Sequence, residues 1–412
     1  MLNEIFENAL TILKGQKIYI AFIILHIYHI TIGEFNMKKT ITYADSGVNI
    51  ELGDDVSKIL YNAAKQTWNN RQGKLGELIV PFDDFSGVRA IDVSNLPTGT
   101  LMNIGFDGVG TKMELAERIN DHRTIAYDLF AMVCDDAVVR GAEPVLIGSI
   151  LDVNSLGNAN GSFLEQVKQL AEGYINAAKS ANVAIVNGEV AELGNRIGGF
   201  GQFNYNWGAA VVWFANKDRL FTGREIQEGN YLVGLQETGF RSNGLSLVRK
   251  IMNANHGEDW HTQTYNGESL AKLALEPSKV YSGAVVDMFG GFQGEPKAKV
   301  HGVAHITGGG VPGKLGRILK PSGLGATISE PYSPAELMLY CQDKGNVPDE
   351  EAYKTWNMGQ GMIIVTPEPE AVMGVARNHN LESKVIGQVE SKPGIRILNS
   401  GAYSQNQYLD FK

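Results

Sequence analysis

The sequence predicts a mixed α/β fold that is divided into two domains. Its 412 residues are more than one ordinary hydrophobic core holds. Short apolar runs typical of strands alternate with longer segments whose apolar residues have helical spacing. The 48 glycines indicate many tight turns, where backbone amides can bind anions. We expect an N-terminal domain at 37–215 and a C-terminal domain at 216–412, each a mixed sheet packed with helices.

Charge and cysteine content exclude several classes of protein. The net charge is −9 and no run of Lys and Arg occurs, which argues against nucleic acid as a partner. Only Cys134 and Cys341 are present, too few for a disulfide framework, and no Cys/His cluster indicates zinc. A reducing, cytoplasmic location fits best.

Residues 1–36 differ in character from the rest of the chain. The apolar stretch Ile18–Ile30 is shorter than the ~20 residues of a membrane span, and it contains His26 and His29. We interpret residues 1–36 as an extension before a start at Met37. A structural or interfacial helix and a membrane anchor are the alternatives, although we expect no membrane association.

The N-terminal domain opens with an amphipathic pattern and continues with alternating strands and helices. Apolar spacing of 3.6 residues marks the helices, and short β-branched or apolar runs mark the strands. The expected helices are about Asp54–Trp68, a helix beginning at Met113, Asp121–Arg140 and Phe163–Ser180. The expected strands are Thr100–Phe106, Val145–Val153, Val183–Val186 and Trp207–Phe214.

The C-terminal domain is expected to start after a polar break at Asn216–Gly229. Its elements follow from the same two patterns. They are strand Tyr231–Leu235, turn Glu237–Asn243, helix Gly244–Asn253, a polar surface loop at His256–Glu268, and strands His301–Thr307 and Met362–Val365.

The hexapeptide DGVGTK carries the first chemical signal. It contains Asp107, Gly108, Gly110, Thr111 and Lys112 just before a helix. Glycines allow amides to approach phosphate oxygens, the helix N-terminus favours negative charge, and a lysine can neutralise it. We predict a phosphate site here. The alternative is an ordinary glycine turn with a surface lysine.

The helix that follows carries Asp128, Asp135 and Asp136 among apolar neighbours. Asp128 and Asp135 are seven residues apart and therefore share one stripe. Buried carboxylates are costly unless a cation or donors compensate them. Mg²⁺ accepts one or two carboxylates together with phosphates, so these acids and Asp107 predict an ATP–Mg²⁺ site. In the alternative, the acids pair with Arg123, Arg140 or backbone amides.

The segment NGEVAE (Asn187–Glu192) is expected to leave a buried strand at its glycine. That position places Glu189 at the carboxyl end of a strand, where α/β sheets bind ligands. Glu189 is therefore a further candidate for the metal. A carboxylate at a helix N-terminus is the alternative.

Two glycine turns in the second half add candidates. TGFRSNG (Thr238–Gly244) precedes a helix that bears Arg249, and HITGGG (His305–Gly310) follows a strand. Gly308, Gly309 and Gly310 provide unhindered amides, while His305 can hydrogen-bond a substrate or transfer a proton. A purely structural histidine is the alternative.

Together these segments resemble phosphoribosylformylglycinamidine cyclo-ligase, also called aminoimidazole ribonucleotide synthetase. The resemblance runs in order from about Tyr43 to Gly387. The segments that carry it are YADSGVNIELG, DGVGTK, DLFAMVCDDAVVRGAEP, NGEVAE, SNGLSLVRK, LEPSKVY, HGVAHITGGG and WNMGQGMIIV.

The resemblance implies ATP-dependent ring closure of formylglycinamidine ribonucleotide in purine biosynthesis, with ATP and Mg²⁺ as cofactors. It implies a homodimer formed through the sheets of the N-terminal domains. It also implies that Tyr43–Gly53, with Asp45 and Gly47, closes over the nucleotide. Ser242, Asn243 and Arg249 are then expected to face the ribonucleotide substrate. We assign catalytic roles to His305, Arg241 and Lys112 on the same basis.

The chain departs from the family pattern at several positions. NGEVAELGN replaces the usual GGETAEMPG, Asp135 replaces an asparagine, and a glycine-rich loop is reduced to Asp83–Gly87. TGFRSNG replaces SGPHSNG, so that Arg241 stands where the family has a histidine. Arginine cannot shuttle protons near neutral pH, so either His305 takes over or the substrate differs.

Two other functions remain open at this point. One is a sister enzyme such as a thiamine-phosphate kinase or a selenophosphate synthetase. The latter is disfavoured because no cysteine precedes Cys134. The other is a catalytically silent paralogue with a regulatory role, although the retained motifs argue against it.

Overall fold

The computed structural model describes residues 50–79, 89–158 and 161–412, together with Asn3, Glu4, Asn8, Lys14 and Gln16. Three sequence predictions concern segments outside these residues: the stretch Ile18–Ile30, the part of the Tyr43–Gly53 segment that holds Asp45 and Gly47, and the loop Asp83–Gly87. Residues 49–412 form one compact unit. Within the described residues, no helix combines the length and the apolar character needed to cross a bilayer.

The first half of this unit is built on a four-stranded mixed sheet. Its strand order is β3 (Thr100–Gly108), β8 (Tyr205–Asn216), β4 (Glu143–Val153) and β7 (Ala184–Glu192). β8 runs antiparallel to both β3 and β4, whereas β4 and β7 are parallel. The parallel pair requires a crossover, which α5 (Leu164–Ala181) provides.

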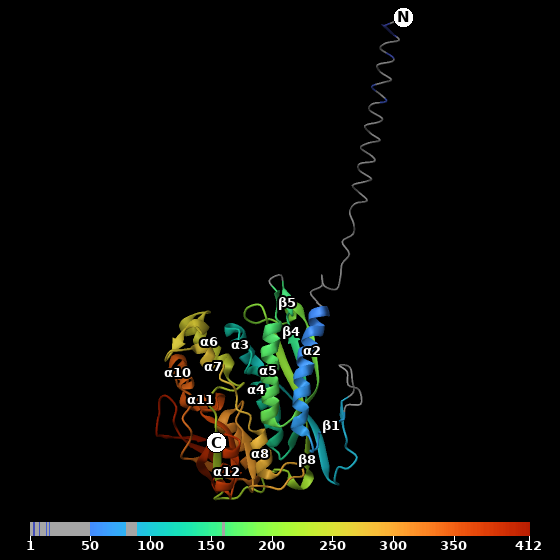
Figure 1. Cartoon of the computed structure of the whole chain (residues 1–412). Helices are drawn as coiled ribbons and strands as arrows, with labels where there is room; N and C mark the ends of the chain where they lie inside the picture. The colour runs from blue at the N-terminus through green and yellow to red at the C-terminus, as the bar shows by residue number, and fades with distance from the viewer. Residues whose placement is uncertain are drawn as a thin grey trace. The chain divides into compact units, whose positions relative to one another are not determined.

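In the part of the chain that the structure describes, helices cover one face of this sheet. α2 (Ile50–Thr67), α4 (Ile125–Val138) and α5 pack together against it (Figure 1). α4 is buried on nearly all sides, because most of its residues are apolar and the second half of the unit covers it. The opposite face of the sheet carries exposed apolar side chains, Met102, Ile104, Phe106 and Ile150.

The second half is built on a seven-stranded sheet in the order β12, β14, β9, β15, β13, β16, β17. Its strands are β9 (Tyr231–Gln236), β12 (Gly302–His305), β13 (Gly325–Ile328), β14 (Gln360–Thr366), β15 (Ser383–Glu390), β16 (Gly394–Leu398) and β17 (Tyr408–Phe411). β14 is buried at every position, which explains its continuous apolar run.

The remaining helices are α3 (Met113–Ile119), α6 (Leu245–His256), α7 (Leu270–Ala274), α8 (Ser282–Phe289), α9 (Gly310–Leu319), α10 (Glu336–Gly345), α11 (Asp349–Thr355) and α12 (Pro369–Asn378). Short two-stranded pairs complete the described elements: β1 (Leu78–Ile79) with β2 (Ala90–Ile91), β5 (Gly157–Asn158) with β6 (Gly161–Ser162), and β10 (Thr264–Tyr265) with β11 (Glu268–Ser269).

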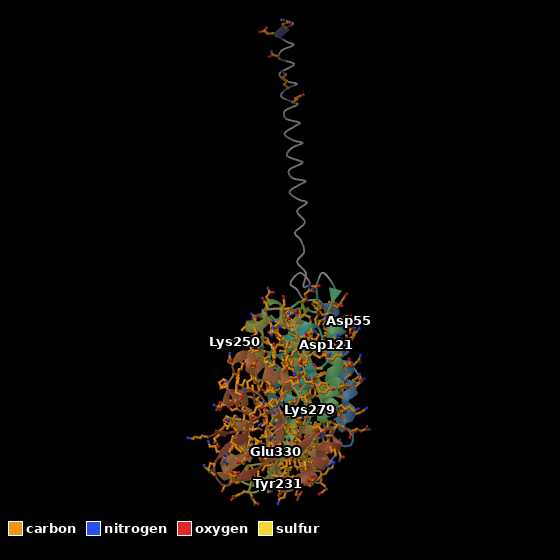
Figure 2. The ribbon with its side chains drawn as sticks, turned by 90° about the vertical axis from the view of Figure 1, so that its left-hand side faces the viewer. Asp55, Asp121, Tyr231, Lys250, Lys279 and Glu330 are labelled. Atoms are coloured by element: carbon orange, nitrogen blue, oxygen red, sulfur yellow. The ribbon has the colours of Figure 1, made fainter. Side chains whose placement is uncertain are left out.

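α4 joins the two halves, because it also contacts α8 and β12 of the second half. Figure 2 shows the unit from the side, with Asp121 and Lys250 at one end, Tyr231 and Glu330 at the other, and Lys279 between them. β9 starts at Tyr231 and ends near the middle of the unit, where the two halves meet. The mixed α/β class is confirmed. The boundary at 215/216 remains a prediction, since both sheets lie in one compact unit.

The structure corrects three elements. The expected helix Asp121–Arg140 begins only at Ile125, because Asp121–Thr124 forms a turn. NGEVAE does not leave its strand, since β7 extends through Glu192 and pairs with β4. The polar segment His256–Glu268 is not simply a surface loop, because it buries Trp260 in the core.

A buried histidine gives the first half a specific pH dependence. His122 is 1% exposed, and its Nδ1 lies 2.9 Å from the hydroxyl of Tyr205. Burial lowers the pKa of His122 to about 4. The unfolded chain binds this proton near pH 6.5, so the neutral ring stabilises the fold above that pH. This contribution is lost as the pH falls from about 6.5 towards 4.

We therefore predict that acid weakens the fold through His122. Between pH 6.5 and 5 the free energy of unfolding should fall by about 2 kcal/mol more in the wild type than in His122→Gln, at ~1.4 kcal/mol per pH unit. Urea unfolding at both pH values measures this difference. Equal losses in the two proteins would show that His122 does not stay neutral in the fold.

Candidate active site

The DGVGTK turn lies where β3 ends and α3 begins. β3 stops at Gly108, a 3₁₀ turn covers Gly110–Lys112, and α3 starts at Met113. Gly110 has φ +72°, a backbone conformation that favours glycine. The predicted strand, glycine turn and helix are therefore present, and the turn carries Asp107 on its strand side.

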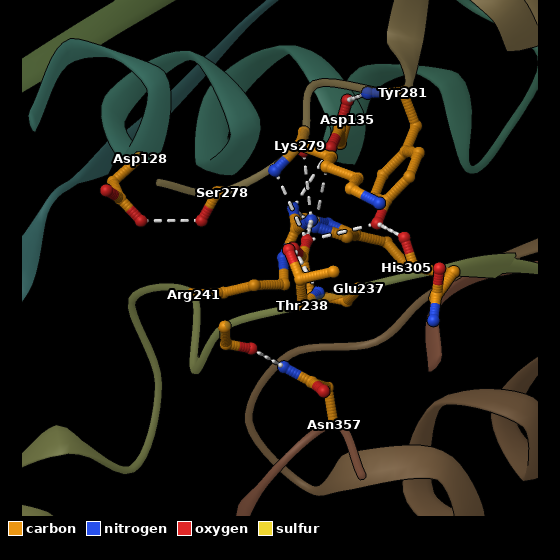
Figure 3. Close-up of polar contacts among 12 residues, drawn as sticks. Asp128, Asp135, Glu237, Thr238, Arg241, Ser278, Lys279, Tyr281, His305 and Asn357 are labelled. Carbon is orange, nitrogen blue, oxygen red and sulfur yellow. Dashed lines mark hydrogen bonds and ion pairs between the residues drawn. The ribbon is translucent and has the colours of Figure 1, made fainter. Parts of the chain in front are cut away.

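Lys112 forms a buried ion pair with Asp128. The ammonium lies 2.7 Å from Asp128 Oδ1, and both side chains are fully buried. Lys112 also donates to the carbonyl of Glu276, and Ser278 donates to the same carboxylate oxygen at 2.5 Å (Figure 3). Burial raises the pKa of Asp128, which the Lys112 charge opposes. The lysine is thus engaged with protein groups, and its role toward a phosphate remains a prediction.

Asp135 is bound by Arg241 and by two backbone amides. Arg241 donates to Asp135 Oδ2 at 3.0 Å, and the amides of Tyr281 and Ser282 donate to Oδ1 at 2.9 and 2.8 Å. Arg241 also donates to Glu237 at 2.7 Å, and all three charged side chains are at most 1% exposed (Figure 3).

The alternative, in which protein groups compensate the acids, is thus observed: backbone amides bind Asp135 as expected, but the cations are not the expected arginines. Asp128 and Asp135 bind Lys112 and Arg241. Arg123 instead pairs with Asp121 at 2.9 Å. Arg140 donates to the carbonyl of Phe221 at 3.3 Å. Lys112 and Arg241 thus form the ion pairs that were expected of Arg123 and Arg140.

His305 connects this buried network to Asp136. Arg241 Nη2 lies 2.8 Å from His305 Nε2, and His305 Nδ1 lies 2.6 Å from Asp136 Oδ1. The His305 side chain is 1% exposed, whereas that of Asp136 is 53% exposed. Burial acts to raise the pKa of Asp136, but the hydrogen bond from His305 and the nearby positive charges of Lys314 and Arg241 together hold this pKa below its usual value.

Asp107 and Lys314 lie beside Asp136. Burial raises the pKa of Asp107, and the nearby Asp136 charge raises it further. Lys314, in the first turns of α9, is close enough to both acids to interact electrostatically with each. Burial lowers its pKa. The sequence analysis did not name Lys314. Its position four residues after Gly310, in the helix that follows the glycine turn, could have indicated it as a candidate.

Glu189 does not join these acids. In the first sheet it pairs with Ile150, which is 55% exposed on the open face. Asp107 pairs with Ala209, which is 7% exposed under the helices. Cross-strand partners share a face, so Asp107 and Glu189 lie on opposite faces, three strand spacings or about 14 Å apart. In the part of the chain that the structure describes, no three His, Cys, Asp or Glu side chains form a metal-binding group.

Three glycine turns meet at the junction of the two halves. A methyl group on Gly110 would lie 3.8 Å from the carbonyl oxygen of Ser242, and one on Gly308 would lie 3.7 Å from Asn243 Nδ2. Thr111 Oγ1 lies 3.4 Å from Ser246 Oγ. TGFRSNG is therefore in contact with both DGVGTK and HITGGG.

Buried polar atoms without a protein partner gather in the middle turn. Ser242 Oγ, Asn243 Oδ1 and Arg249 Nε are buried and make no hydrogen bond within the described structure. Arg249 keeps one ion pair, with Glu114. Such unpaired groups cost ~1–3 kcal/mol each, so their presence indicates places where a ligand binds.

The glycines of HITGGG do not all serve the same purpose. Gly309 has φ +93° and precedes α9, whose N-terminus favours anions. Gly310 has φ +58°, its amide donates to the carbonyl of Thr307 at 2.8 Å, and any side chain there would collide with the backbone of Tyr353. Gly310 is therefore required by the turn itself, while Gly308 and Gly309 are exposed.

Comparisons with known proteins identify the family. The description "AIR synthase related protein, N-terminal domain" matches residues 89–202, and its C-terminal counterpart matches residues 227–398. Fold and matched ranges thus define a two-domain α/β protein of the AIR synthase type.

Individual relatives narrow this class. A phosphoribosylformylglycinamidine cyclo-ligase of Thermococcus kodakarensis is 34% identical, over 88% of this chain and 99% of the relative. The one of Pyrococcus furiosus is 31% identical, over 88% of this chain and 98% of the relative. The chain therefore belongs to the phosphoribosylformylglycinamidine cyclo-ligase family, as its motifs predict, and the expectation of a ligase is confirmed.

Solved structures support the fold alone. A thiamine-monophosphate kinase from Stenotrophomonas maltophilia aligns with a TM-score of 0.54 at 14% identity, covering 84% of this chain and 97% of that one. HypE of E. coli, a hydrogenase maturation protein, aligns with a TM-score of 0.52 at 17% identity, covering 86% and 97%.

We predict that Lys112 stabilises the fold. Lys112→Met leaves Asp128 buried without its cation, which should lower the free energy of unfolding by about 3–5 kcal/mol. Adding Asp128→Asn should recover much of that loss. Urea unfolding of both variants measures this. As a control, Lys58→Met removes an exposed ion pair with Asp55 and should cost no more than ~1 kcal/mol.

The opposite pattern would assign Lys112 to a phosphate. In that case Lys112→Met would leave unfolding unchanged and raise the KM for ATP.

Proposed function

We propose that the chain uses ATP to close the ring of formylglycinamidine ribonucleotide, forming aminoimidazole ribonucleotide, ADP and phosphate. Two relatives that align with this chain over nearly their whole length, at 34% and 31% identity, carry the cyclo-ligase name. The observation on this chain that carries the proposal is a set of three buried atoms that make no hydrogen bond in the described structure: Ser242 Oγ, Asn243 Oδ1 and Arg249 Nε. Such a set fits a polar, phosphorylated substrate.

The residues present fit a Mg²⁺–nucleotide complex. Mg²⁺ is usually held by one or two carboxylates together with substrate phosphates. Asp107 and Asp136 interact electrostatically and are only partly covered, so they would hold it. When bound, the ion would neutralise phosphate charge. Asp128 and Asp135 are not needed as ligands, because protein cations already compensate both.

Phosphate recognition is shared by the turns and one lysine. The exposed Gly308 and Gly309 precede α9 and offer amides at a helix N-terminus. Gly108 and Gly110 follow Asp107 and also offer backbone amides, and Thr111 adds a hydroxyl next to them in sequence. Lys314, rather than the enclosed Lys112, supplies the positive charge near Asp107 and Asp136.

The chemistry needs these groups mainly for positioning. In the expected reaction the oxygen of the formyl amide takes the γ-phosphoryl group of ATP. An amidine nitrogen then attacks the formyl carbon that bears this oxygen, and phosphate leaves. Both steps depend on alignment and on neutralised phosphate charge. Ser242 and Asn243 would orient the ribonucleotide, Arg249 would bind its phosphate, and Lys314 would stabilise the transferring group.

An assay of the purified full-length chain tests the reaction. With Mg²⁺ and ATP, ADP should appear only when formylglycinamidine ribonucleotide is added. Asp136→Asn should lower kcat at least ~100-fold with little change in thermal unfolding. Asn243→Ala should lower kcat/KM by about 10–100-fold without loss of stability, because it removes an unpaired buried group.

Two matched controls accompany this assay. Asp343→Asn changes an exposed acid, and Asn255→Ala removes an amide that donates to Ile251 and Lys344 carbonyls. Neither should change kcat/KM more than about twofold, within the usual range for surface changes. ADP release that ignores the ribonucleotide, or depends instead on thiamine phosphate, would refute the assignment.

We also propose that two copies associate through the open face of the first sheet. Met102, Ile104, Phe106 and Ile150 are 44–77% exposed there. Contiguous exposed apolar patches of this kind mark interaction sites. The free, buried Cys134 and Cys341 are consistent with the cytoplasmic location that we propose.

The dimer is tested by analytical ultracentrifugation. The wild type should sediment as a dimer, and Phe106→Asp with Met102→Lys should sediment as a monomer, because both changes charge the face. Ile79→Lys, on the separate strand β1, is the matched control and should remain dimeric. A monomeric wild type at micromolar concentration contradicts the proposal.

A further inference from the structure

The contact between Arg241 and His305 determines where the histidine carries its proton. Arg241 Nη2 lies 2.8 Å from His305 Nε2. A guanidinium has only donors, so Nε2 must accept and cannot hold a hydrogen. The ring hydrogen is then on Nδ1, which lies 2.6 Å from Asp136 Oδ1. His305 is thereby a neutral ring that donates to Asp136.

We propose that Arg241 is a positioning residue that acts through His305 on Asp136. Glu237 and Asp135 hold the guanidinium at 2.7 and 3.0 Å. The guanidinium fixes the tautomer of His305, and His305 holds one oxygen of Asp136. The significance for catalysis rests on the proposed function, in which Asp136 binds the metal–nucleotide complex.

Charge compensation alone does not explain this arrangement. Two acids already outweigh the single charge of Arg241, so its bond to His305 is not needed for neutrality. Every Nη atom of Arg241 is used: Nη1 for Glu237 and the carbonyl of Lys279, Nη2 for Asp135 and His305. The guanidinium also lies 5.1 Å from the centre of the Tyr281 ring. Its direction is therefore fixed from several sides.

The backbone at this position supports the same conclusion. Arg241 has φ +61°, which is uncommon for a residue with a long side chain. Such conformations are energetically costly and cluster at functional sites. The strain is maintained in the same turn that carries the unpaired Ser242 and Asn243.

The geometry also restricts what His305 can do. Its Nε2 faces Arg241, its Nδ1 faces Asp136, and the side chain is 1% exposed. Both ring nitrogens are therefore engaged with protein groups, which makes His305 an orienting group and not a proton shuttle.

The proton position is measured by ¹⁵N NMR on the full chain labelled at histidine. The His305 signals are assigned by their loss in His305→Asn. In the wild type, Nδ1 should have the shift of a protonated ring nitrogen and Nε2 that of an unprotonated one. In Arg241→Met the Nε2-protonated form should appear. A wild-type His305 that carries its hydrogen on Nε2, or on both nitrogens, overturns the proposal.

The effect on Asp136 is measured by calorimetry with Mg²⁺ and ATP, without the second substrate. Arg241→Met should weaken binding by about 10–100-fold, as loss of an outer-shell partner does. Glu237→Gln is the matched control, because it removes an ion pair of Arg241 and keeps the bond to His305. It should lower stability and change binding by no more than about threefold, within ordinary experimental spread.

Equal weakening by both variants, in step with their loss of stability, would make Arg241 purely structural and overturn the proposal. If Arg241→Met does not fold, the wild-type NMR result decides alone. Neither readout requires turnover, so a failure of the proposed cyclisation is recognised separately.

Discussion

Burial of ionised groups is the constraint on which the site depends. Lys112, Asp128, Asp135, Glu237 and Arg241 all have side chains that are at most 1% exposed. Each buried charge costs several kcal/mol unless a partner compensates it. α4 supplies Asp128 and Asp135, and the segment after β9 supplies Arg241 and Glu237. Arg241 binds Asp135 across the junction of the halves. Lys112 and Asp128 both belong to the first half, but they contact Glu276 and Ser278 of the second. The two halves can therefore pack only in an arrangement in which each buried acid lies beside a buried cation.

This requirement places the site at the junction of the halves. β3, β9 and β12 each end in a glycine turn that leads to a helix, namely α3, α6 and α9. The turn after β9 contacts the other two turns, and the helix N-termini provide amides and a favourable field for anions. Asp107, Asp136 and Lys314 lie at the same junction. The buried ion pairs thus stabilise the packing of the two halves. The partly exposed Asp107, Asp136 and Lys314 are the charges that we propose for ligand binding.

Much of the fold follows from local patterns in the sequence. β3 and β9 begin as expected because their apolar runs are bounded by clear turn residues. The end of β7 could not be predicted, because Gly188 suggested a break and only pairing with β4 keeps the strand extended. Likewise, the burial of Trp260 depends on packing against residues distant in sequence, which a short stretch of sequence does not show.

The site was predictable as a set of motifs but not as a set of contacts. Residue type and spacing predicted buried acids on this helix. Asp128 and Asp135 are buried, whereas the side chain of Asp136 is 53% exposed. Their partners Lys112 and Arg241 could not be chosen from the sequence, because Arg241 lies 106 positions from Asp135. The face on which a strand residue points depends on register, which is why Glu189 was grouped with Asp107.

The most direct measurement is a crystal structure of the chain with Mg²⁺ and a non-hydrolysable ATP analogue. The metal and the terminal phosphate should lie beside Asp107 and Asp136, with Lys314 near the phosphate. Lys112 should remain on Asp128, and Arg241 on Asp135 and His305. A structure in which Lys112 leaves Asp128 for a phosphate, or in which Asp128 or Asp135 coordinates the metal, would contradict the separation of buried frame and ligand-binding charges.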